Sequence, residues 1–135
     1  MNYIDDIRTF LITQYPTVPV YLENLASSGD IVDQIMISSE PGTVDTQLPI
    51  VRVNFSIFVQ SRDQQFAINT ANNIFCILNN KRGKLDSLST NSFSQISAVG
   101  PPYEFSSGGS TALYQVKFNA IVIEKSIKTY QLNSI

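Results

Sequence analysis

The chain has 135 residues, of which 43% are hydrophobic and 15% charged, and its formal net charge is -2. This length fits one domain that buries a core without disulfides or metal, and the net charge excludes a general attraction to nucleic acid or anionic membrane. Because interface cores are depleted of charged residues, the low charge content favours burial of surface against neighbouring molecules.

Residues 2–14 have the pattern of an amphipathic helix, with apolar side chains at spacings of three and four. The stripe consists of Tyr3, Ile4, Ile7, Phe10 and Leu11. Asn2 can cap this helix, and Asp5 and Asp6 fall in its first turns, where the helix dipole favours negative charge. Pro16 and Pro19 end it.

Two short strands are predicted next, at residues 20–22 and 34–39, and the turn at 27–30 between them predicts a hairpin. A loop over 40–47 then leads to a long strand at 50–60. Its apolar side chains alternate with polar ones, so one face is predicted to be buried and one polar. The buried set is Val51, Val53, Phe55, Ile57 and Val59, and the polar set is Arg52, Asn54, Ser56 and Gln60.

A second helix is predicted from Ser61, which has capping-box spacing to Gln64, to about Asn80. Its apolar stripe consists of Ala67, Thr70, Ala71, Ile74, Ile77 and Leu78. Lys81 and Arg82 suit the negative helix end, and Gly83 can adopt the left-handed conformation that terminates helices.

A strand from Phe93 breaks at 100–102, and a polar loop follows until 111. The final long strand places Tyr114, Val116, Phe118, Ala120 and Val122 on one face, and Gln115, Lys117 and Asn119 on the other. The sequence therefore predicts one α+β domain over 1–124, with a mainly antiparallel sheet of about four to five strands and two helices packed on one face. Residues 125–135 lack a clear period and are predicted to be a C-terminal tail that reaches a neighbour.

Cysteine and histidine usage limits the chemistry, because Cys76 is the single cysteine and histidine is absent. Intramolecular disulfides and histidine-dependent nucleophilic catalysis are excluded, and zinc would lack its commonest nitrogen ligand. We interpret Cys76 as a buried packing residue. Asp5 with Asp6, Asp30 and Asp33 have the positions of helix and turn residues, so we predict no catalytic, cofactor-binding or metal-binding residue and no enzyme activity.

The N-terminus has acids where a signal peptide needs a basic start, and no apolar run approaches the roughly 18 residues of a membrane span. We therefore expect synthesis in the cytosol and no membrane partner. Arg52 and Lys117, on polar strand faces, and Arg62, at the strand–helix junction, are candidate interface residues. For Asp63 beside Arg62, helix capping is favoured over interface contact.

Lys81, Arg82 and Lys84 form a basic cluster for which capping and solvation are favoured over a phosphate-facing or lumen-facing role. The loops at 40–47 and 101–110 are long for a compact domain, where about 4 to 6 residues is usual. We expect both loops to project and to carry binding.

Specific segments narrow the function: a strand ending in Val59-Gln60-Ser61-Arg62-Asp63, a helix through Ala67, Ala71, Ile74 and Leu78, and Gly100-Pro101-Pro102-Tyr103 before a closing strand. This order resembles the tail terminator, or tail completion, proteins of tailed bacteriophages, also labelled minor capsid proteins, over roughly residues 2–124.

The resemblance implies a structural virion protein that forms a ring, usually a homohexamer, at the head-proximal end of the tail. Such a ring ends tail-tube polymerisation and provides the head–tail joining surface, with no cofactor. The implied partners are further copies of the chain, the tail tube protein and a head-side connector or neck protein, with non-specific DNA passage through the lumen. The implied location is the tail or neck of the virion, and the host cytoplasm during assembly.

Ring closure would let exposed strand edges of neighbouring copies pair. Two alternatives stay open at the level of sequence. The chain is also compatible with a head-completion or neck connector protein of the same virion and, less well, with a soluble ligand-binding α+β domain.

Overall fold

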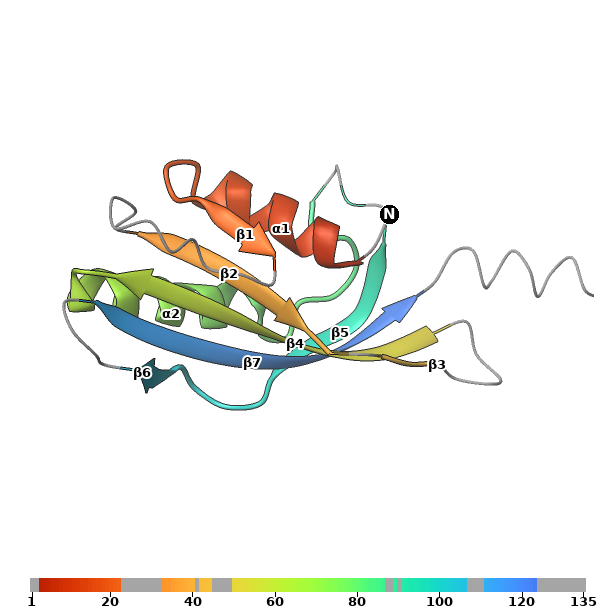
Figure 1. Cartoon of the computed structure of the whole chain (residues 1–135). Helices are drawn as coiled ribbons and strands as arrows, with labels where there is room; N and C mark the ends of the chain where they lie inside the picture. Colours follow the sequence, from red (N-terminus) through yellow and green to blue (C-terminus); the bar gives the residue numbers. More distant parts are fainter. Residues whose placement is uncertain are drawn as a thin grey trace, which may run out of the picture.

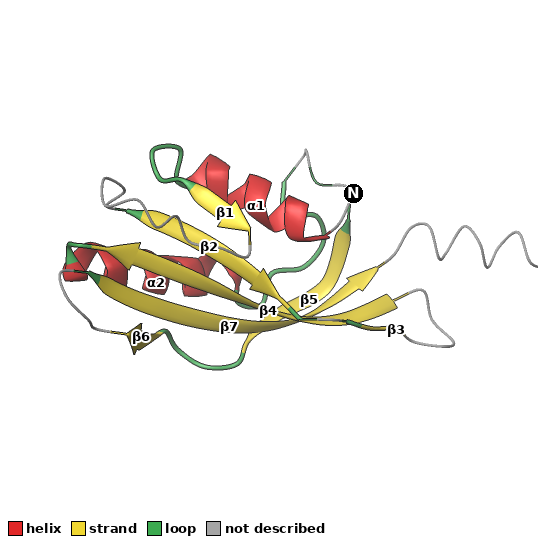
Figure 2. Ribbon diagram, viewed as in Figure 1, coloured by secondary structure: helices red, strands yellow, loops and turns green. Residues whose placement is uncertain are grey.

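The computed structural model describes residues 3–22, 33–40, 42–44, 50–86, 89, 91–106 and 111–123. Over these residues the chain is an α+β domain with two helices and a mainly antiparallel sheet (Figures 1 and 2). The elements are α1 (Tyr3–Gln14), β1 (Val20–Leu22), β2 (Gln34–Ser39), β3 (Thr43–Val44), β4 (Ile50–Ser61), α2 (Gln64–Leu78), β5 (Ser92–Ala98), β6 (Tyr103–Ser106) and β7 (Ala112–Ile123).

The sheet is centred on β4 and β7, which pair antiparallel along their whole lengths, from Ile50 opposite Ile123 to Ser61 opposite Ala112. The strand order is β1-β2-β4-β7-β5, with β3 on β4 and β6 on β7. The predicted hairpin of the first two strands is wrong, because β1 and β2 pair in parallel. Parallel neighbours need a connection of about a dozen residues instead of a tight turn, and residues 23–33 supply a segment close to that length.

The described sheet has seven strands, more than the four to five predicted, because two segments predicted as loops contain strands. β3 continues the path of β2 along β4, and β6 continues the path of β5 along β7. Proline and glycine at 41–42 and at 100–102 are typical of turns. Here each segment separates two strands that bind the same neighbour, as at a bulge or an edge strand. The described parts of both predicted loops therefore pair with their own sheet, contrary to the expectation that the loops project.

Gly42 lies at the first of these interruptions, pressed against β4. A Cβ atom at this position would lie 2.9 Å from a γ-methyl of Val51 and of Val53, and 3.0 Å from the carbonyl oxygen of Arg52. Real Cβ atoms essentially never come this close to other heavy atoms. A residue without a side chain thus lets the chain lie close against β4 between β2 and β3.

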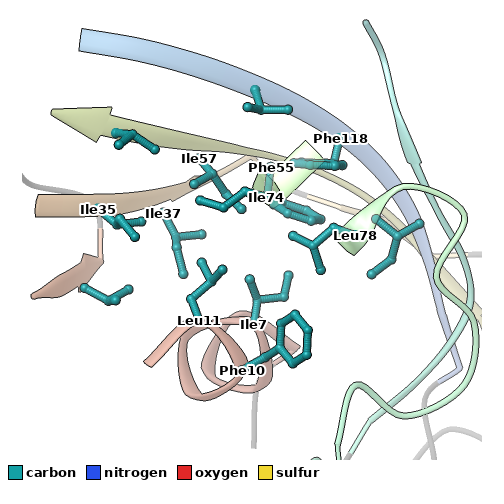
Figure 3. Close-up of a cluster of buried hydrophobic side chains, with 14 of the residues drawn as sticks. Ile7, Phe10, Leu11, Ile35, Ile37, Phe55, Ile57, Ile74, Leu78 and Phe118 are labelled. Carbon is teal, nitrogen blue, oxygen red and sulfur yellow. The ribbon is translucent and has the colours of Figure 1, made fainter. Parts of the chain in front are cut away.

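The core is one cluster that combines both helices with the apolar faces of the strands. Its ten labelled side chains are Ile7, Phe10, Leu11, Ile35, Ile37, Phe55, Ile57, Ile74, Leu78 and Phe118 (Figure 3). α1 contacts β1 and β2, whereas α2 contacts β4, β5 and β7. Phe55 and Phe118 stack with their ring centroids 5.2 Å apart. The predicted buried faces of β4 and β7 are confirmed, except that Val51 is only half-buried.

Both predicted helices are present, and their apolar stripes are buried apart from the partly exposed Tyr3 and Ile77. Asp6, which was assigned to the dipole of the first turn, is also buried. Its Oδ2 accepts hydrogen bonds from the backbone N–H of Asn91 at 2.8 Å and from the Asn91 side chain at 3.0 Å. This carboxylate therefore ties α1 to the segment that precedes β5.

The predicted capping box at the start of α2 is wrong. Asp63 is the N-cap, and its Oδ1 accepts from the N–H groups of Gln65 at 3.0 Å and Phe66 at 3.3 Å. Ser61 is the last residue of β4, so the helix begins too late for its hydroxyl to cap it; the Ser61 hydroxyl instead accepts from the N–H of Asp63. The amide of Gln64 donates to the hydroxyl of Tyr114 at 3.1 Å. The favoured capping role of Asp63 is thereby confirmed.

The end of α2 corrects two further predictions. The first residue in left-handed conformation after the helix is Asn80, which follows the C-cap Asn79 and has φ 67°, whereas Gly83, with φ 81°, forms a bridge with Phe93. Asparagine tolerates this conformation because its short polar side chain can bond locally. Cys76 is exposed, not buried. It lies two residues from both Ile74 and Leu78, about 200° around the helix from each, and therefore faces away from the core.

Three predictions fall outside the described residues: the Asn2 cap, the turn at 27–30 and the tail at 125–135.

Candidate functional site

The polar sides of β4 and β7 share one face of the sheet, which we call the outer face. Arg52 and Asn54 on β4, and Lys117 and Asn119 on β7, are exposed on it. Asn54 lies directly opposite Asn119, and Lys117 lies opposite Ser56. Since Ser56 is four residues from Arg52, the two cations are roughly 13 Å apart along the strand direction. The structure thus brings two of the three predicted interface residues onto one surface.

The outer face contains two adjacent hollows. The first, of about 480 Å³, is lined by side chains or backbone of Thr43, Arg52, Asn54, Gln95, Ser97 and Asn119, among others. The second, of about 210 Å³, is lined by residues that include Glu40, Ser56, Val99 and Lys117, and it shares Asn54 and Asn119 with the first. Five strands or strand ends therefore contribute to one depression, which is lined by both polar and apolar groups.

The chemistry of this surface is that of recognition. Amide and hydroxyl groups offer both donors and acceptors, Arg52 offers a planar fork for a carboxylate, and Lys117 offers a point charge. Among the described residues, no three Cys, Asp or Glu side chains gather into a group that could hold a metal ion. The arrangement suits polar contact with another protein surface.

Gln115 was predicted on the polar face of β7, but it is buried. Its Oε1 accepts from the hydroxyl of Tyr103 at 2.6 Å, and its Nε2 donates to the hydroxyl of Ser56 at 3.0 Å. Tyr103 lies directly opposite Gln115 on β6, a strand that the sequence did not predict. The hydrogen-bonded chain fixes the start of β6 to β7 and β4.

Next to the polar part, the outer face carries an aromatic patch, defined by Phe58, Val99, Tyr103 and Phe105. The Phe105 ring meets Phe58 edge-on with centroids 5.2 Å apart. Val99, Tyr103 and Phe105 are exposed by 62%, 44% and 56%. Sequence reasoning missed this patch, although Phe58 gives a signal by interrupting the polar alternation between Ser56 and Gln60.

Arg62, the third predicted interface residue, is exposed but lies just beyond the far end of β4. Its separation from Arg52 is ten residues, about 33 Å along an extended strand. The structure therefore does not bring Arg62 together with the other two.

The basic cluster lies in a segment that runs along the edge of β5 that does not pair with β7. Asn80 N–H donates to the carbonyl of Ile96 at 2.7 Å, Ile96 N–H donates to the carbonyl of Lys81 at 2.9 Å, and Gly83 and Phe93 exchange two further bonds. These bonds occupy the edge of β5, so this edge is not available for the strand pairing between copies that was expected.

The three cations of this segment differ in their surroundings. The Nζ of Lys81 lies 5.7 Å from the centroid of the Phe10 ring, whereas Arg82 and Lys84 are exposed. Lys81 therefore has a packing role, and only Arg82 and Lys84 present their charge fully to solvent.

Comparisons with known proteins give the fold alone. No protein-family model and no curated protein matches this sequence. One solved structure, whose name states no function, matches 89% of this chain and 89% of its own chain, with a TM-score of 0.57 and 11% sequence identity. Within the described residues, neither helix is long and apolar enough to cross a membrane.

Proposed function

We propose that this chain is a structural protein of a bacteriophage virion that forms a ring, a homohexamer by resemblance, at the head-proximal end of the tail. The ring would end tail-tube polymerisation and provide the surface that joins tail to head. Its activity is binding rather than catalysis, and its partners are its own copies, the tail tube protein and a head-side connector. Its place is the tail or neck of the virion, after assembly in the host cytoplasm.

The observation that supports assembly most directly is the outer face. In this proposal both helices cover the buried side of the sheet and leave the outer face to neighbouring copies or tube subunits. Its two hollows combine amide and hydroxyl groups with the exposed charges of Glu40, Arg52 and Lys117, so a partner can bind there through hydrogen bonds and ion pairs. Arg52 can then bind a neighbour's carboxylate through two parallel hydrogen bonds.

The first experiment is light scattering and negative-stain electron microscopy of the purified protein, with and without tail tube protein. Rings that cap the ends of tubes are the expected result. Binding to portal or head proteins in place of tubes would identify a head-completion or neck connector instead. A chain that stays monomeric and leaves tube ends open at high concentration contradicts the proposal.

Charge reversals test which face assembles. Arg52→Glu and Lys117→Glu should lower the fraction of chains in rings, because each places an acid in the contact. Lys84→Glu makes the same change beside β5 and should leave ring formation unchanged. All three residues are exposed, so each change should alter the free energy of unfolding by no more than about 0.5 kcal/mol. Unaltered rings in the first two variants would exclude the outer face as the interface.

A ligand-binding domain is the second candidate, because the first hollow has the size of a small-molecule site, about 300–1,000 Å³. A screen of small polar ligands by thermal shift separates the two functions. Two results together would favour the ligand-binding domain: a ligand stabilises the protein but not the Asn54→Ala variant, and the protein does not cap tubes.

DNA passage through the ring would engage Arg82 and Lys84. In a plot of the logarithm of the DNA-binding constant against the logarithm of the salt concentration, each phosphate contact that is lost should reduce the steepness of the slope by about one unit. Arg82→Gln and Lys84→Gln should therefore flatten that dependence, and an unchanged slope in both variants would remove these residues from the DNA path.

A further inference from the structure

Toward the aromatic patch, the polar side chains of the outer face bond one another. Gln34 Nε2 donates to Gln60 Oε1 at 3.1 Å. Gln115 joins the hydroxyls of Tyr103 and Ser56. Much of the hydrogen-bonding capacity in this part of the face is therefore used within the chain.

The first hollow differs, because its polar side chains lack such partners. Arg52, Asn54 and Asn119 are all exposed. Within the part of the chain that the structure describes, none of these three side chains takes part in a hydrogen bond or ion pair. The hollow therefore offers a guanidinium and two amides to a ligand.

The register of four strands brings the lining side chains together. Arg52 lies opposite Thr43 on β3 and opposite Ile121 on β7, and Ile121 in turn lies opposite Gln95 on β5. Neighbouring strands are about 4.8 Å apart, so Arg52 and Gln95 lie about 10 Å apart, with Ile121 between them. The adjacent row consists of Asn54, Asn119 and Ser97.

The charge of the hollow selects the class of ligand. Arg52 is the single charged residue among the described residues that line it. The other cation of the outer face, Lys117, lies roughly 13 Å away along the strand direction. One guanidinium can balance a carboxylate through two parallel hydrogen bonds. A phosphate monoester carries about 1.5 to 2 negative charges at pH 7, which is more than this hollow balances.

Ile121 determines what the carboxylate is attached to. Its side chain is partly buried and lies directly beside Arg52 in the row. A carboxylate held by the guanidinium therefore has its next atoms over an apolar surface, where methylene groups gain from burial. A carboxylate on a short chain of methylenes is the form of a glutamate side chain.

The second hollow favours a protein over a free acid as the source of this carboxylate. The two hollows adjoin and share Asn54 and Asn119. A small acid in the first hollow would leave the exposed charges of Glu40 and Lys117 in the second to solvent. A protein surface can cover both hollows and meet those charges as well.

We propose that the first hollow binds a glutamate side chain of the protein that docks on the outer face. The carboxylate pairs with Arg52, the methylenes pack against Ile121, and Asn54 and Asn119 bond the polar atoms around them. The docking protein in this contact rests on the proposed function, whereas the preference of the hollow for a carboxylate does not.

An NMR titration of the full-length, isotope-labelled chain tests the hollow, at a concentration at which light scattering shows monomers. The ligand is the α-amide of N-acetylglutamate, which carries one side-chain carboxylate and no other charge. The α-amide of N-acetylglutamine is its neutral counterpart of nearly the same shape. The glutamate compound should shift the side-chain signals of Arg52, Asn54 and Asn119. The glutamine compound should bind about tenfold more weakly, because it lacks the charged acceptor.

Two arginine variants locate the effect. Arg52→Gln should bind the two compounds equally. Arg62→Gln is the matched control, because Arg62 is also exposed but lies just beyond the far end of β4. It should keep the preference for the glutamate compound. Equal binding of the two compounds by the unsubstituted chain, or an unchanged preference in Arg52→Gln, would overturn the proposal.

Tube capping in the presence of each compound separates this contact from the proposed function. An excess of the glutamate compound, but not of the glutamine compound, should lower the fraction of capped tubes. Capping that neither this excess nor Arg52→Gln alters would overturn the glutamate contact and keep the terminator function. Selective binding at Arg52 in a protein that caps no tubes would keep the carboxylate site and reject the terminator function.

Discussion

Replacement of Gly42 by alanine tests whether the chain just before β3 lies as close to β4 as the structure describes. The new methyl group would meet the γ-methyls of Val51 and Val53 at 2.9 Å and the Arg52 carbonyl oxygen at 3.0 Å. Val53 is only 3% exposed, and its β-branched side chain has few alternative rotamers. Neither the backbone oxygen nor these methyls can yield without a shift of the strand.

The magnitude follows from two opposing effects. Overpacking of this kind costs about 1–3 kcal/mol. Because alanine gives the unfolded chain less conformational freedom than glycine, the substitution also stabilises the folded state by about 0.4–1 kcal/mol. Gly42→Ala should therefore destabilise the protein by about 1–2 kcal/mol, which corresponds to a fall in melting temperature of about 4–7 °C for a domain of this size.

Gly100→Ala is the matched control, because a Cβ at this position would meet nothing within 4 Å. Gly100→Ala should only reduce the conformational freedom of the unfolded chain. Its melting temperature should therefore equal that of the unsubstituted protein or lie slightly above it. Calorimetry or circular dichroism melts of the two variants give the comparison. Equal melting temperatures for both variants would refute the close approach of Gly42 to β4.

Three further predictions concern the two helices and the residues at their ends. Asp63→Ala should lower the free energy of unfolding, measured in urea, by about 1 kcal/mol, because it removes the N-cap of α2. Gln64→Ala should lower it distinctly less. A larger loss in Gln64→Ala than in Asp63→Ala would favour the capping box instead. Burial raises the pKa of the Tyr15 hydroxyl above its ordinary value of 10.0. The folded state therefore holds this proton more tightly than the unfolded chain, so the contribution is complete below about pH 10 and is lost as pH rises through the folded pKa. Tyr15→Phe should flatten the fall in stability at alkaline pH, and an identical fall would contradict it. Cys76 should react with a thiol reagent in the folded protein at a rate close to that in urea, and strong protection would contradict its exposure.

Local periodicity determined much of the fold in advance. Alternation along β4 and β7 assigned their core faces, and three-and-four spacing assigned the buried sides of α1 and α2. These assignments succeed because the direction of a side chain depends on the geometry of its own element. The exposure of Cys76 belongs to the same class, since its helical position already placed it opposite Ile74 and Leu78.

The outer face was predictable only in part. The exposure of Arg52 and Lys117 followed from alternation, but their presence on one surface depends on the register that sets Ser56 opposite Lys117. The aromatic patch depends on β6, and the segment of proline and glycine before β6 concealed a resumed strand.

Partners distant along the chain were decided by tertiary structure. Three features involve segments that meet only in the folded protein: the parallel pairing of β1 with β2, the burial of Gln115 beside β6, and the closure of the β5 edge by residues 80–83. A repeating pattern specifies which way a side chain points. The strand that lies beside it, and what covers its edge, depend on the packing of the whole sheet.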